Sequence, residues 1–184
     1  MHQYRLIDDG TGTLRGVFAR SFGNWSGNKE IEALAVDNEL GYVYLADEGY
    51  GVRKYHADPA ARKADDELAV IGREGFAGDH EGISIYKTGP RTGYILISNQ
   101  QNNSFRIFTR EGSPSGPHDH QFLKEVDVSA IESDGSEVTN VALPGFPKGL
   151  FVAMSNGKVF HYHAWEDIAG SDLQQTPVTI EPKR

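Results

Sequence analysis

Apolar and polar residues alternate along much of the chain, and the alternating stretches come in similar groups. In each group an acidic residue stands near the start of an alternating apolar run, and a second apolar run follows after a short turn. Alternation with a period of two is typical of β-strands that bury one face, and two such runs joined by a turn predict a β-hairpin. The three groups are residues 29–36 with 42–48, residues 79–86 with 94–100, and residues 136–142 with 149–155.

The groups recur at a similar spacing. Glu32 and Glu81 stand at equivalent places and are 49 residues apart, and Glu137 follows 56 residues after Glu81. A repeat of about 50 residues with several strands in each unit is typical of a β-propeller blade, because such a unit cannot bury both faces of its sheet without neighbours. We therefore predict an all-β fold, a partial β-propeller of roughly three to three and a half four-stranded blades.

The whole chain, residues 1–184, is predicted to form one partial propeller domain. Two strands near residues 3–7 and 15–22 precede the first acidic group, so we interpret residues 1–28 as the outer strands of an incomplete blade. Residues 165–169 are expected to form one helical turn. Three blades follow. Residues 29–76 are expected to form strands near 31–37, 42–47, 51–57 and 67–73, and residues 77–130 strands near 82–87, 93–99, 104–110 and 121–128. Residues 131–184 are expected to form strands near 137–142, 149–154 and 158–163.

The charge balance excludes several classes of partner. The chain has 26 acidic and 18 basic residues and a formal charge of −8. This balance argues against binding to nucleic acid or to an anionic membrane, because both need a basic surface. The absence of cysteine excludes disulfides and thiolate metal sites. No run approaches the ~18 apolar residues that span a bilayer, and the first residues lack the apolar core of a signal peptide.

The acidic residues at the starts of strands are the candidate chemistry of the chain. The innermost strand of each propeller blade lines the central channel, so Glu32, Glu81 and Glu137 are expected to converge at one mouth of that channel. Like charges at such distances repel each other unless they are protonated or neutralised, and a metal ion is the usual neutraliser. The available ligands are carboxylates, amides and backbone carbonyls, which favour Ca²⁺ over Zn²⁺.

The order and spacing of several short motifs make a specific resemblance. The motifs are Ile31-Glu32, Ala46-Asp47-Glu48, Asp79-His80-Glu81-Gly82, Ser98-Asn99-Gln100, Ser133-Asp134-Gly135 and Lys148-Gly149-Leu150-Phe151-Val152-Ala153. From about residue 3 to residue 169, the chain resembles the C-terminal half of the β-propeller phytases. These are calcium-dependent alkaline phosphatases that act on myo-inositol hexakisphosphate (phytate). The resemblance implies a six-bladed ring, of which this chain holds about half.

The resemblance also implies a ligand set and a mechanism. Clustered calcium ions would clamp the phosphate oxygens and lower the pKa of a bridging water that attacks the phosphorus. Bound calcium would also let an acidic protein hold a very acidic substrate. The implied calcium ligands are Glu32, Glu48, Asp79, Glu81, Gln100 and Asp134, of which the first four are the implied catalytic residues.

The resemblance further implies what this chain lacks. In the family, the first half of the propeller supplies further calcium ligands and the basic and tyrosine side chains that hold a second phosphate group. The ring is therefore expected to be completed by a missing N-terminal half or by another copy of the chain. Family members are secreted or periplasmic, so we expect the same location here, although the chain shows no signal peptide.

Two other functions remain open on the sequence. A non-catalytic half-propeller that binds calcium or a protein would keep the carboxylates but lack basic side chains beside them. A calcium-dependent lactonase on another type of propeller would need a pair of catalytic histidines near the channel. His118 and His120 are instead expected in a solvent-exposed loop, because residues 110–120 are rich in Gly, Pro and Ser. The basic residues nearest to the predicted ring in sequence are Arg20, Arg53, Lys54, Arg73 and Lys87.

Overall fold

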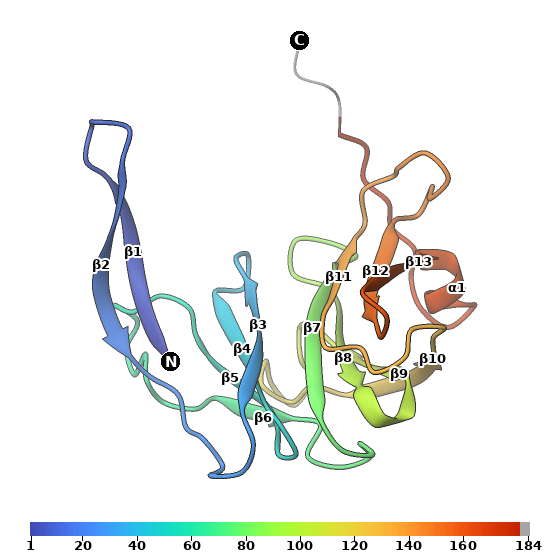
Figure 1. The fold of residues 1–184 in the computed structure, drawn as a ribbon, viewed down its shortest axis with the longest axis horizontal. Coiled ribbons are helices and arrows are strands. Elements are labelled where there is room, and N and C mark those ends of the chain that lie inside the picture. The colour runs from blue at the N-terminus through green and yellow to red at the C-terminus, as the bar shows by residue number, and fades with distance from the viewer. Residues whose placement is uncertain (181–184) are drawn as a thin grey trace.

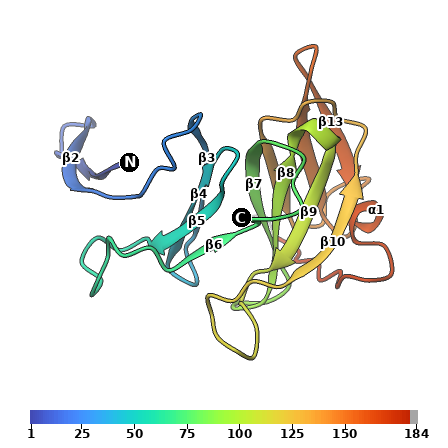
Figure 2. The ribbon, with the colours of Figure 1, turned by 90° about the horizontal axis from the view of Figure 1, so that it is seen from below.

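The strands of this protein form separate small antiparallel sheets that follow one another around an open arc (Figures 1 and 2). A computed structural model describes residues 1–180. The arrangement is a partial β-propeller, as the sequence predicts. The strands are β1 (His2–Asp8), β2 (Leu14–Ser21), β3 (Ile31–Asp37), β4 (Tyr42–Asp47), β5 (Gly51–His56), β6 (Ala69–Ile71), β7 (His80–Lys87), β8 (Gly93–Asn99), β9 (Ser104–Thr109), β10 (Phe122–Asp127), β11 (Ser136–Thr139), β12 (Leu150–Ser155) and β13 (Val159–Ala164), and the helices are η1 (Gln100–Asn102) and α1 (Trp165–Ala169).

Strands that are consecutive in the sequence are also neighbours in space. The sheets have the orders β1-β2, β3-β4-β5-β6, β7-β8-β9-β10 and β11-β12-β13. The first strand of each of the last three sheets lies on the inner side of the arc, where β7 contacts both β3 and β11. These three strands line a groove of about 430 Å³, to which Val36, Ile85 and Val138 contribute. The groove has the place of the central channel in a closed ring.

Apolar contacts between adjacent sheets make the core. Tyr44 and Ala46 on β4 pack with Ile95 and Ile97 on β8, and all four are fully buried. On the other side of the β7–β10 sheet, the indole of Trp165 stacks on Tyr86 with ring centroids 3.7 Å apart. The β7–β10 sheet therefore buries both of its faces against neighbouring elements, as an inner propeller blade does.

The last sheet has three strands within the described residues, as its predicted strands near 137–142, 149–154 and 158–163 imply. The structure differs from the sequence prediction at one loop. The expectation that His118 and His120 are solvent-exposed is wrong. Both are half-buried, because the loop folds back onto β5 and Lys54 places its ammonium 3.0 Å from His120 Nε2.

The described residues contain no helix that is long and apolar enough to cross a membrane.

Candidate functional site

Two β-bulges aim acidic side chains at the same place. The pairing of β3 with β4 shifts by one residue between Ile31 and Leu34, and the pairing of β7 with β8 shifts in the same way between His80 and Ile83. Glu32 and Glu81 lie inside these shifts. A bulge inserts one unpaired residue and turns the side chains beside it away from their regular alternation. The repeat seen in the sequence is therefore also a repeat of backbone geometry.

Gly82 allows the backbone of β7 to lie against the next sheet. A Cβ atom at this position would be 2.7 Å from the backbone nitrogen of Ser136 and 3.0 Å from backbone atoms of Gly135. Only glycine fits so close an approach without a shift of the backbone. The contact brings the loop that carries Asp134 up to the side of Glu81, which explains why Glu81 is followed by glycine.

The bulges and the ends of the second strands bring two groups of carboxylates together. In one group, Glu30, Glu32 and Glu48 have ligand oxygens within 4.8 Å of one another, and in the other, Glu48, Asp79 and Glu81 do. Glu48 belongs to both groups and joins them. Glu30 and Glu32 are exposed, whereas the other three are buried. The structure thus gathers all four of the predicted catalytic residues into one cluster.

The electrostatics of the cluster are unfavourable without a cation. Burial and the nearby charges of Glu48 and Glu32 raise the pKa of Glu81 to about 8, and burial also raises the pKa of Glu48. The Oε2 atom of Glu81 is buried and has no hydrogen-bond partner. A buried polar atom without a partner costs free energy. A cation held among these carboxylates would offset both costs.

One basic side chain reaches the cluster. Lys29 donates hydrogen bonds of 2.5 Å to both oxygens of Asp79, and its ammonium lies 3.9 Å from Glu48. Its side chain is half-exposed, and these contacts raise its pKa, with the hydrogen bonds to Asp79 as the largest cause. Sequence reasoning missed Lys29.

The basic residues named from the sequence are bound elsewhere. Arg20 and Lys54 donate to backbone carbonyls, Arg53 pairs with Asp47 and Glu67, Arg73 lies over the ring of Tyr50, and Lys87 pairs with Glu39.

Gln100 and Asp134 lie beside the cluster and are bound to each other. The side-chain amide of Gln100 donates to Asp134 at 2.6 Å, and Gln100 accepts from Gln101. Gln101 also donates to Asp79 at 2.8 Å, so a chain of amides connects Asp134 to the buried carboxylates. Neither Gln100 nor Asp134 belongs to the two carboxylate groups, and their role as ligands stays a prediction.

Glu137 does not join the ring of carboxylates that its spacing predicts. The strand that carries it, β11, pairs with β12 without any shift in register. Without a bulge, its carboxylate stays on the strand and accepts a hydrogen bond from the backbone N–H of Val138. The third repeat is thus similar in sequence but lacks the backbone feature that aims the other two carboxylates.

Sequence reasoning also missed Glu30 and Gln101 beside the cluster. Glu30 stands two residues before Glu32, as Asp79 does before Glu81, and this matching spacing was a signal that could have identified Glu30. Gln101 gave no comparable signal, because its contact with Asp79 depends on the turn formed by η1, where Asp79 N also donates to Gln101 Oε1.

The donor set suits a hard divalent cation. All ligand atoms in the two groups are carboxylate oxygens, and Glu81 supplies a buried oxygen that has no other partner. Calcium and magnesium prefer such oxygen ligands, whereas zinc prefers nitrogen and sulfur in most protein sites. The residues present therefore fit a bound cation of this kind.

Fold and site together define a partial β-propeller that carries an acidic cluster of metal-binding character at one end of its inner strands. A sequence profile of the phytase family matches residues 1–176, and the chain belongs to this family. It is 29% identical to the 3-phytase of Bacillus subtilis (strain 168) over 179 aligned residues, which cover 91% of this chain and 46% of that protein. The chain thus spans about half the length of this curated relative.

Proposed function

We propose that this chain carries the calcium-binding part of a phytase-like phosphoric-monoester hydrolase that removes phosphate from phytate. The family match and the relative named 3-phytase support this substrate class. The observation that carries the proposal is the buried carboxylate of Glu81, whose Oε2 atom has no hydrogen-bond partner and which lies in one group with Glu48 and Asp79. An acidic cluster of this kind favours calcium as the cation.

Each carboxylate has a separate part in the proposal. Glu48 is shared between the two groups and would bridge the cations held in them, while Asp79 and Glu81 would hold the buried side and Glu32 the exposed side. Gln100 and Asp134 would border the site. Calcium bound there would neutralise phosphate charge and lower the pKa of a coordinated water.

Lys29 gives the site a movable positive charge. Its long side chain reaches the cluster from the exposed side, and it now pairs with Asp79. A dication in the cluster would replace the ammonium as the partner of Asp79, since a dication at a carboxylate is the larger local charge. The freed ammonium would then lie where it can hold a phosphate oxygen of the substrate.

The test is phosphate release from calcium phytate by the folded chain, with and without a calcium chelator. We expect release that the chelator abolishes and that is lost in Glu81→Gln. Glu74→Gln is the matched control, because Glu74 is exposed and lies outside the two carboxylate groups. Release that survives both the chelator and Glu81→Gln would overturn the proposal.

A second candidate is a half-propeller that binds calcium without catalysis. One observation favours it. Within residues 1–180, Lys29 alone among the basic side chains forms an ion pair with the cluster, so few positive charges are near the site to hold a phosphate group. Calcium binding to a folded chain that releases no phosphate would support this alternative over the enzyme.

A further inference from the structure

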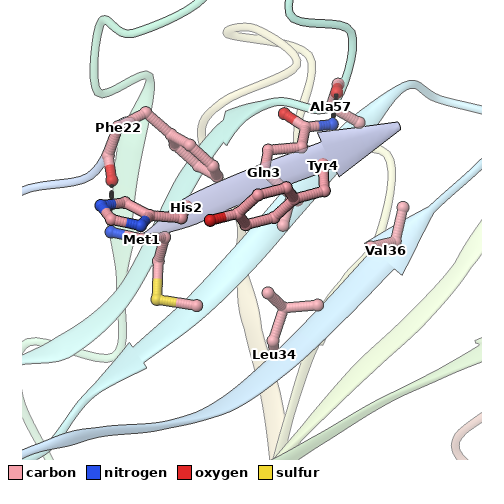
Figure 3. A pocket seen from close by; sticks show the side chains of 9 residues that line it. Met1, His2, Gln3, Tyr4, Phe22, Leu34, Val36 and Ala57 are labelled. Carbon is pink, nitrogen blue, oxygen red and sulfur yellow. Dashed lines mark hydrogen bonds between the residues drawn. The ribbon is translucent and has the colours of Figure 1, made fainter. Parts of the chain in front are cut away.

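Side-chain amides gather at the turn η1, beside the acidic cluster. The cavity of about 250 Å³ between the β1–β2 hairpin and β3 is mostly apolar, with Tyr4 and Leu34 among its lining residues (Figure 3). At η1, in contrast, the side chains of Gln100 and Gln101 are hydrogen-bonded to predicted cation ligands. The polar surface at η1 therefore bears directly on the site.

Gln101 holds Asp79 at two points. Its Oε1 atom accepts a hydrogen bond from the backbone N–H of Asp79 at 2.6 Å, and its Nε2 atom donates to Asp79 Oδ2 at 2.8 Å. One planar amide thus binds both the main chain and the carboxylate of the same residue. Rotation of the carboxylate about the Cα–Cβ bond would break the second contact, so Gln101 favours one orientation of Asp79.

The same amide also reaches Gln100. Nε2 of Gln101 donates to Gln100 Oε1 at 2.9 Å, and Gln100 in turn donates to Asp134 at 2.6 Å. An amide NH₂ group has two donors, so Gln101 can bind Asp79 and Gln100 at the same time. Gln101 thereby connects three of the predicted calcium ligands without being one of them.

The contacts of Gln101 do not depend on Lys29. The Lys29 ammonium now binds both oxygens of Asp79, and the proposed function has a cation take its place. Gln101 would then still hold the backbone N–H and Oδ2 of Asp79, which would leave Oδ1 as the oxygen available to a cation. The carboxylate would not need to turn when the two positive groups exchange.

The turn that carries Gln101 is anchored on its other side. Asn99 and Asn102 both donate to Oε1 of Glu125 on β10, each at 2.9 Å. These bonds fix η1 against the outer strand of its own sheet. The place of Gln101 is therefore set by contacts other than its own bonds to Asp79.

Gly78 leaves room for the Gln101 side chain. A Cβ atom at Gly78 would clash with Oε1 of Gln101 and would lie 2.7 Å from its Cδ atom. The φ angle of Gly78 lies outside the left-handed region, so any residue could adopt its backbone conformation. The space that Gln101 occupies, rather than the backbone, requires glycine at this position.

We propose that Gln101 is a positioning residue of the cation site, which holds Asp79 and Gln100 in their binding orientation before a cation arrives. Because the cation belongs to the proposed function, this role of Gln101 rests on that function. Side chains that orient metal ligands through hydrogen bonds contribute about 10–100-fold to metal affinity. Gln101 is exposed, so its replacement leaves no cavity in the core.

The test is the calcium dissociation constant of the folded chain, measured by calorimetry. Gln101→Met keeps the length of the side chain but removes its amide, and we expect it to weaken calcium binding by about tenfold or more. The melting temperature without calcium should change little. Gln121→Met is the matched control and should bind calcium as the wild type does. Gln121 is also exposed and also donates to an aspartate, Asp119, but it lies at the opposite end of β10 from η1.

The possible results separate this role from the proposed function. Equal calcium binding by the wild type and Gln101→Met would overturn the role of Gln101 alone. A large fall in the calcium-free melting temperature of Gln101→Met would also overturn it, because Gln101 would then support the fold rather than the ligands. A wild type that binds no calcium would overturn the proposed function together with this role.

A second variant displaces Gln101 without altering it. Gly78→Ala places a Cβ atom where the Gln101 amide lies, so we expect it to weaken calcium binding by a factor similar to that of Gln101→Met. In the Gly78→Ala background, Gln101→Met should then cause no further loss, because both changes remove the same contacts. A further tenfold loss in the double variant would overturn the proposal, since Gln101 would then act through other contacts.

Discussion

Two regions with buried carboxyl groups within residues 1–180, one around Asp37 and one around Glu48 and Glu81, have opposite electrostatic surroundings. Between the second and third sheets, Asp37 receives two hydrogen bonds from the Arg110 guanidinium, at 2.6 and 2.7 Å, and both side chains are fully buried. Where β7 begins and β4 ends, Glu81 and Glu48 are buried beside each other with no arginine among their partners. The first region is complete by itself, and the second is not.

The pKa values express this difference. Burial is the largest single influence on Asp37 and raises its pKa, but the hydrogen bonds from Arg110 and from the backbone N–H of Leu40, together with the charge of Arg110, lower the pKa below its usual value. Burial and like charges instead raise the pKa of Glu81 to about 8. Asp37, which has its own arginine, ties two sheets together, whereas the carboxylates gathered without an arginine are the site that we propose for a cation. Adjacent residues can differ in this way, since Asp47 pairs with Arg53 while Glu48 turns toward the cluster.

The largest effect on stability is expected from removing one partner of the buried Asp37–Arg110 pair. Arg110→Met leaves Asp37 buried without its cation, and loss of one partner of a buried pair costs about 3–5 kcal/mol. We expect that loss in the free energy of unfolding, measured by urea denaturation. In the double variant Asp37→Asn with Arg110→Met, much of the loss should return, because no charge is then stranded. Equal destabilisation by the single and double variants would show that packing, rather than the charge, matters here.

The next largest effect is expected in the cluster of Glu48 and Glu81, where a substitution should lower activity rather than stability. Glu81→Gln removes a cation ligand, so we expect phosphate release to fall by more than about 100-fold. The free energy of unfolding without calcium should stay the same or rise, because the substitution removes a buried group that like charges disfavour and whose Oε2 atom has no hydrogen-bond partner. A marked fall in stability without calcium would place Glu81 with the structural carboxylates instead.

A smaller effect is expected at Lys29. Its ammonium occupies Asp79 when no cation is bound, so Lys29→Met should tighten calcium binding by about fivefold, as expected for removal of one exposed competitor. The measurement is a calcium titration by calorimetry. Lys87→Met is the control, because Lys87 pairs with Glu39 away from the cluster. Weaker calcium binding in Lys29→Met would mean that the lysine supports the site rather than competes for it.

The last effect concerns pH and the half-buried imidazole of His120. Burial and the neighbouring Lys54 lower the pKa of His120 to about 4, against about 6.5 in the unfolded chain. Between these values the unfolded chain binds more protons, so the free energy of unfolding falls as the pH decreases from 6.5 to 4. His120→Gln should make that fall less steep, measured by urea denaturation at several pH values. The same slope in both proteins would show that His120 does not carry this dependence.

The sequence predicts the strands well because their signal is local. Alternation over a few residues and the Gly- and Asp-rich turns place β3, β4, β7 and β8 within one or two residues of their observed limits. The acidic cluster is also predicted, since Glu32 and Glu81 recur at equivalent places before the same hairpin. Both signals depend only on neighbouring residues and on the repeat.

Contacts between distant residues could not be predicted in this way. Lys29 and Asp79 are 50 positions apart, and Asp37 and Arg110 are 73 apart, and no local pattern pairs them. Glu137 shows the limit of the repeat, because its spacing is correct but its strand lacks the bulge. The position of a bulge depends on how two strands pair, which the residues of one strand do not determine.

The most direct test of the central claim is calcium binding to the substrate-free chain, measured by calorimetry for the wild type and for Glu81→Gln. If the incomplete region is a cation site, the wild type should bind calcium and should melt at a higher temperature in its presence, and Glu81→Gln should lose most of both effects. Equal calcium binding by the two proteins would contradict the assignment of the buried cluster as the site.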